Sequence, residues 1–136
     1  MNADNMKDLA KIRFERAQEL IVDAENLLKS DSYKSANNRA YYASEKAIKA
    51  ALAVKGKDSE SHTGVIKTFN MEFIRTPCNF FDRSDLSILQ GMERIRTASD
   101  YDDFYIANKT ECEEQVRKAK NLMEKVEGYL RSENVI

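Results

Sequence analysis

The sequence contains very few of the residues that make tight turns. The 136 residues include four Gly and one Pro, whereas β-sandwiches and β-barrels need turn residues at most of their hairpins. This scarcity favours long uninterrupted helices and an all-α fold. The length fits one domain, and 42% hydrophobic with 33% charged residues is typical of a globular protein rather than of a disordered chain or a membrane span. We therefore expect a single helical domain over residues 1–136.

Apolar side chains recur every three or four residues in five stretches, which is the helical period. The expected helices are 4–29, 32–54 with Ser32 as its cap, 62–74, a fourth that Ser84 or Asp85 can cap, and a last one with an apolar stripe from Cys112 to Leu130. A loop is expected over 76–83, before the fourth helix. The pattern predicts an up-and-down antiparallel helical bundle of about four to five helices.

Charge and cysteine content exclude several functional classes. Lys and Arg total 22 against 23 Asp and Glu, so any contact with nucleic acid has to come from a local patch rather than from the charge of the whole chain. Cys78, Cys112 and His62 form no zinc-binding pattern, and the sequence contains no phosphate-binding glycine loop or common hydrolase motif. We expect no metal, no cofactor and no membrane association. The charged N-terminus is unlike a signal peptide, which predicts a cytoplasmic protein.

The segment 93–105 concentrates arginine, tyrosine and aspartate near the end of the fourth expected helix. If the helix continues through it, Arg94, Tyr101 and Tyr105 share one face. With Arg96, these residues could bind RNA or a nucleotide, because guanidinium groups bind phosphate oxygens and phenol rings stack on bases. The segment is therefore a candidate nucleotide or RNA site.

The same segment also has a purely structural interpretation. Arg96 lies three residues after Glu93 and four before Asp100, so it could form a salt-bridged helix end with these two carboxylates. We expect structural roles for three other polar residues, Asn38, Arg39 and His62. An inward Asn38 would fix the position of a neighbouring helix, and His62 at a helix start is more often a cap or a buried hydrogen-bonding group than a catalyst.

Three separated motifs in a fixed order resemble one known family. They are SYKSANNRAYYASEKAIKAAL, SHTGVIKTFNMEFI and RIRTASDYDDFY, followed by a long charged helix. The sequence is similar over about residues 8–131 to the HEPN superfamily, and specifically to small stand-alone prokaryotic members. The resemblance implies a bundle of four or five helices, a homodimer, and a toxin-like role beside a minimal nucleotidyltransferase that acts as antitoxin.

The resemblance also implies where chemistry would lie. Catalytically competent members have an Arg, four to six residues and a His, which together cleave RNA without metal. Here Tyr101 stands five positions after Arg96, where the histidine is expected, and His62 lies outside the motif. The catalytic candidates are Arg96, Asp100 and Tyr101. In toxin members a nearby tyrosine is nucleotidylated by the partner, a role that Tyr101 or Tyr105 could take here.

Three hypotheses follow from the sequence. The leading one is an RNA- or nucleotide-binding component of a toxin-antitoxin-like pair, without the motif histidine. The second is an atypical metal-independent endoribonuclease. The third is a structural dimeric interaction module in which the arginine and aspartate residues brace the fold.

Overall fold

The computed structural model describes residues 2–136, which form five α-helices and one π-helical turn. The elements are α1 (Ala3–Lys29), α2 (Tyr33–Val54), α3 (His62–Phe69), the turn η1 (Asn70–Ile74), α4 (Arg83–Tyr101) and α5 (Lys109–Ser132). The predicted all-α helical bundle is confirmed. Among the described residues, no helix combines the length and the apolarity that a membrane span needs.

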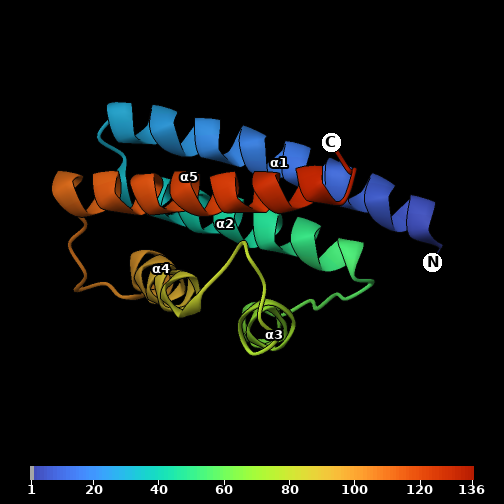
Figure 1. Ribbon diagram of the computed structural model, residues 1–136. Coiled ribbons are helices and arrows are strands. Elements are labelled where there is room, and N and C mark those ends of the chain that lie inside the picture. The colour runs from blue at the N-terminus through green and yellow to red at the C-terminus, as the bar shows by residue number, and fades with distance from the viewer. Residues whose placement is uncertain (1) are drawn as a thin grey trace.

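The three long helices form the body of the bundle. In Figure 1, α1, α2 and α5 run side by side, while α3 and α4 are seen nearly end-on and therefore cross them steeply. Helix α2 runs antiparallel to α1 and in the same direction as α5. It packs against α1, α3, α4 and α5. The alanine-rich helix is thus the central one.

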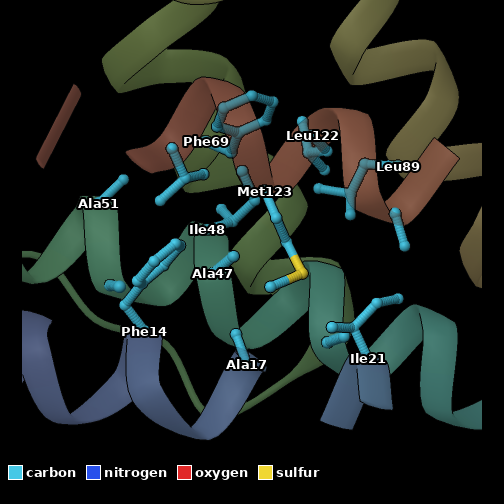
Figure 2. Packing of buried hydrophobic residues seen from close by; sticks show 14 of the residues in the cluster. Phe14, Ala17, Ile21, Ala47, Ile48, Ala51, Phe69, Leu89, Leu122 and Met123 are labelled. Carbon is cyan, nitrogen blue, oxygen red and sulfur yellow. The ribbon is translucent and has the colours of Figure 1, made fainter. Parts of the chain in front are cut away.

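Small side chains allow α1 and α2 to approach closely. Both helices place fully buried alanines, including Ala10, Ala17, Ala24, Ala40, Ala43, Ala47 and Ala50, in the hydrophobic core. Without longer side chains at these positions, the ridges of one helix can enter the grooves of the other. Larger residues such as Phe14, Ile48 and Met123 fill the space toward α5 (Figure 2).

Two helix beginnings differ from the sequence predictions. Ser32 occupies the cap position of α2, but its side chain makes no capping hydrogen bond. Helix α4 begins at Arg83, and its cap is Asp82 rather than Ser84 or Asp85. Asp82 accepts from the backbone of Ser84 and Asp85, while the Asp85 carboxylate accepts from the Asp82 backbone. This reciprocal capping box satisfies amide groups that Ser84 or Asp85 alone would leave free.

The helix predicted over 62–74 is α-helical only as far as Phe69. It continues as the π-helical turn, in which the Arg75 amide donates to the Asn70 carbonyl at 2.8 Å. Phe69 and Phe73 on either side of this change are both buried, and both rings pack against Phe81 at 5.2 Å between centroids. The change from α- to π-helix thus coincides with the packing of these three rings. The periodicity of the sequence carries no information about such contacts.

Cys112 is fully buried on α5. Burial, followed by the nearby carboxylates of Glu111 and Glu113, raises the pKa of its thiol to about 11. Because the thiolate is the reactive form, we expect a thiol reagent at mildly alkaline pH to leave Cys112 unmodified in the folded protein and to modify it after denaturation. Peptide mass spectrometry measures this directly. Rapid modification of Cys112 in the native protein would contradict the packing described here.

Candidate functional site

Arg96 of α4 is a buried cation surrounded by aromatic rings. Its side chain is 6% exposed. The guanidinium carbon lies 5.6 Å from the centre of the Tyr41 ring, 5.8 Å from that of Tyr42 and 6.0 Å from that of Tyr101. Tyr41 and Tyr42 come from α2, and Tyr101 is the last residue of α4. Electron-rich faces of this kind attract a cation, and more strongly where water is excluded.

Two carboxylates balance the charge of Arg96. Its guanidinium donates to Glu93 at 2.7 Å and to Asp100 at 3.4 Å, which confirms the salt-bridged helix end that the spacing predicts. Its Nε atom is buried and has no hydrogen-bond partner among the described residues. Although burial acts in the opposite direction, the hydrogen bond to Glu93 holds the pKa of Arg96 above its ordinary value. The group is a permanent cation fixed in place.

Helix α2 is joined to this end of α4 by two asparagines. Asn38 donates to the two Asp100 oxygens at 3.2 and 2.9 Å. Asn37, which is more deeply buried, donates to Ser99 at 3.2 Å. Arg39 is exposed and donates to the Asn38 side chain at 2.9 Å. Asn38 therefore has the partner on a neighbouring helix that its expected structural role requires, and Asn37 is a second such residue that the sequence analysis did not single out.

His62 lies in the same cluster, although it is far from Arg96 in the sequence. Its Nδ1 atom makes a hydrogen bond with a Glu45 carboxylate oxygen, and its Nε2 atom lies 3.5 Å from the Tyr42 hydroxyl. The imidazole ring packs edge-on against Tyr41 and Tyr42 at 5.4 and 5.5 Å. The two tyrosines thus contact Arg96 and His62 at once.

Tyr41 and Glu45, which the sequence analysis did not identify as site residues, support this histidine. They lie four residues apart on α2, and the buried Tyr41 hydroxyl donates to Glu45 at 2.9 Å. Burial, followed by the Glu45 charge, raises the pKa of Tyr41 far above its ordinary value, so this phenol keeps its proton. The one sequence feature that could have identified these two residues is their spacing, because side chains at positions i and i+4 contact each other on a helix.

Comparison with known proteins identifies the family. The HEPN domain family matches residues 10–129. The chain belongs to the HEPN family. It is 32% identical over 130 residues to "Putative toxin MJ0142" of Methanocaldococcus jannaschii, covering 96% of this chain and 86% of the relative. It is 31% identical over 115 residues to a "UPF0332 protein" of Thermotoga maritima, covering 85% and 86% of the two chains.

In this HEPN chain only two of the four predicted binding residues, Arg96 and Tyr101, contact each other. Arg94 is exposed while Arg96 is buried, because two positions on a helix point about 200° apart. Tyr101 is 75% exposed at the helix end. Helix α4 ends there, so Tyr105 does not share its face as the continuous helix would require. The Tyr105 hydroxyl is instead buried, without a hydrogen-bond partner among the described residues.

A hollow of about 450 Å³ opens on the surface of this HEPN protein next to Asp100 and Tyr101, which contact Arg96. It is lined by Lys34, Ser35, Asn38, Arg39, Ser99, Asp100 and Tyr101. Two cations and an exposed phenol ring therefore face one space between the beginning of α2 and the end of α4. No cluster of metal-binding side chains occurs within residues 2–136.

Proposed function

We propose that this HEPN protein binds RNA or a nucleotide in the hollow between α2 and α4. The observation that carries the proposal is the placement of Lys34, Arg39 and Tyr101 around one space. Lysine and arginine bind phosphate groups, and an exposed phenol ring can stack on a base. The proposal assigns Arg96 a positioning role, because its guanidinium is buried and already bonded to carboxylates.

We further propose that the protein acts as a homodimer and as the toxin-like member of a pair with a minimal nucleotidyltransferase. Membership of the HEPN family and the name of the M. jannaschii relative, which refers to a toxin, support this proposal. Tyr101 is the more accessible tyrosine for nucleotidylation by such a partner. Light scattering during gel filtration tests the dimer, and recovery of a nucleotidyltransferase with the tagged protein from its host tests the partner. A monomer, or recovery without that enzyme, would contradict the respective part.

Binding should depend on Arg39. Replacing it with Gln removes an exposed cation at the hollow, so we expect the affinity for a short fluorescein-labelled single-stranded RNA to fall roughly three- to tenfold. The slope of log affinity against log salt should fall by about 0.7, the value of one phosphate contact on a single strand. Fluorescence anisotropy measures both quantities, and ATP as a competitor tests the nucleotide alternative.

Arg117→Gln is the matched control for this experiment. Arg117 is an exposed arginine of α5, outside the hollow, and is paired with Glu114. Its replacement removes the same charge, so a general electrostatic effect would lower the affinity equally in both variants. Equal losses, or an absence of binding by the wild type, would refute the proposed site.

A metal-independent endoribonuclease is the second candidate function. The observation that favours it is the position of His62, which shares Tyr41 and Tyr42 with Arg96. The motif histidine is absent, but an imidazole nevertheless packs against the same two tyrosine rings as the arginine. Cleavage of the labelled RNA in EDTA tests this candidate, and intact RNA after prolonged incubation with protein that binds it would exclude it.

A further inference from the structure

We infer that the hollow between α2 and α4 selects guanine over the other bases, and that the Asp100 carboxylate makes this selection. The selection rests on the RNA or nucleotide binding proposed above and names the base that is bound. Asp100 lines the hollow, and 26% of its side chain is exposed. A carboxylate repels phosphate groups, so the part of a ligand that lies against Asp100 has to carry hydrogen-bond donors.

The two walls of the hollow differ in charge. Helix α2 supplies the cations Lys34 and Arg39, and the end of α4 supplies Asp100 and Tyr101. Cations bind phosphate groups, and the carboxylate repels them. A nucleotide in the hollow is therefore oriented, with its phosphate toward α2 and its base toward α4. The volume of about 450 Å³ lies within the usual range of small-ligand pockets.

Asp100 retains free capacity to accept hydrogen bonds. An ionised carboxylate offers about four lone-pair sites. Two donors within residues 2–136 use this one, the Asn38 amide at 3.2 and 2.9 Å from the two oxygens and the Arg96 guanidinium at 3.4 Å. Arg96 has a closer partner in Glu93, at 2.7 Å. About two acceptor sites of Asp100 are therefore left for a ligand.

Guanine is the base whose Watson–Crick edge matches this carboxylate. Its N1–H and N2–H groups are neighbouring donors, and they can bind the two carboxylate oxygens at once, as an arginine side chain does. Adenine and cytosine have one amino group beside a ring nitrogen that accepts, and uracil has one N–H between two carbonyl oxygens. In these three bases an acceptor atom would face the carboxylate and repel it. Single-stranded bases expose this edge to a protein.

Tyr101 and Asp100 contribute differently to base binding. The Tyr101 ring is 75% exposed, and its centre lies 6.0 Å from the Arg96 guanidinium carbon. An exposed phenol ring stacks on any base, so Tyr101 adds affinity without choice. Asp100 adds the choice, because its hydrogen bonds depend on the edge of the base. Asn38 and Arg96 hold the carboxylate in place before the ligand arrives, which lowers the entropy lost on binding.

The first test uses the wild-type protein and short fluorescein-labelled uridine strands that differ only in the central base. We expect the strand with guanine to bind roughly five- to hundredfold more tightly than the strand with adenine, as for one two-point base contact. Inosine lacks the N2 amino group, so its strand should have an intermediate affinity. Fluorescence anisotropy measures the affinities. Equal affinities for guanine and adenine would overturn the inference and leave RNA binding standing, whereas no binding of any strand would overturn both.

Asp100→Asn gives a second test, with a result that a structural role alone does not produce. Asparagine keeps one acceptor oxygen and replaces the other with an amino donor. It therefore matches xanthine, which has a carbonyl oxygen where guanine has its N2 amino group. We expect the variant to lose the preference for guanine over adenine and to bind a xanthosine strand more tightly than the wild type does. A weakened fold would lower the affinity for every strand, so a variant that folds normally without this gain would overturn the inference.

Asp23→Asn is the matched control for the loss of charge. Asp23 is an exposed residue of α1, outside the hollow. Its replacement removes the same negative charge, so a general electrostatic effect would change the affinity for all strands alike. The control should keep the wild-type preference for guanine. Loss of the preference in both variants would contradict the role of Asp100.

Free nucleotides show whether the guanine belongs to RNA or to a mononucleotide. GMP and AMP are added as competitors of the labelled guanine strand. Stronger displacement by GMP supports guanine selection for a free nucleotide as well. A guanine preference among the strands, without displacement by either nucleotide, supports selection within RNA. Stronger displacement by AMP than by GMP would overturn the inference.

Discussion

Replacing Arg96 with Ala is expected to lower the free energy of unfolding by about 2–4 kcal/mol. The change removes the cation that pairs with Glu93 and Asp100, and with it the guanidinium group that packs against the Tyr41 and Tyr42 rings. Loss of one member of a buried pair is among the most costly substitutions. The expected loss is smaller than the largest losses known for buried ion pairs, because both carboxylates retain contact with water. Urea denaturation followed by circular dichroism measures it.

Arg94→Ala is the matched control for this prediction. Arg94 lies on the same helix but is exposed, so its removal should change stability by no more than about 0.5 kcal/mol. Arg96→Lys should recover part of the loss, since it restores the charge but not the planar stacking or the two-point hydrogen bonding. Equal effects of Arg94→Ala and Arg96→Ala would show that Arg96 does not brace the cluster.

The same variant separates two of the functional hypotheses. If the protein is a structural dimeric module, Arg96→Ala lowers stability without changing the affinity for RNA. If the hollow binds RNA, loss of Arg96 also weakens binding, because Asp100 and Tyr101 lose the group that positions them. Measuring affinity well below the unfolding temperature of the variant keeps these effects apart.

Replacing Phe73 with Ala is expected to cost about 3–5 kcal/mol of unfolding free energy. Phe73 is 1% exposed, and its ring packs edge-on against Phe81 at 5.2 Å and Tyr129 at 5.0 Å. The substitution removes these contacts and leaves a cavity where η1 meets α5. The expected loss exceeds that of Arg96→Ala because no part of the removed ring is solvated. Urea denaturation measures it.

Phe104→Ala provides the comparison for the same chemical change. Phe104 lies between α4 and α5 and is 94% exposed, so its truncation should alter stability by no more than about 0.5 kcal/mol. A large loss in Phe104→Ala would mean that this ring is covered in solution by another chain, such as a second copy of this protein. The gel-filtration measurement of mass distinguishes these cases.

Much of the fold follows from local pattern. The scarcity of Gly and Pro and the three-four spacing of apolar residues predict the helical bundle and place the ends of α1 and α2 within a few residues. The ion pairs of Arg96 with Glu93 and Asp100 are equally predictable, because all three residues lie within two turns of one helix. The end of α4 at Tyr101 was not predictable in this way, since 93–105 continues a helical spacing.

The sequence by itself determined the fold class, the helices and the charge balance along α4, because each depends on residues a few positions apart. Only the tertiary structure decided that Glu45 meets His62, that Asn38 meets Asp100, and that Arg94 and Arg96 have different environments. The first two contacts join residues 17 and 62 positions apart. Such contacts depend on the angles at which α3 and α4 cross α2. These angles are determined by the packing of many side chains at once and not by the periodicity of any one segment.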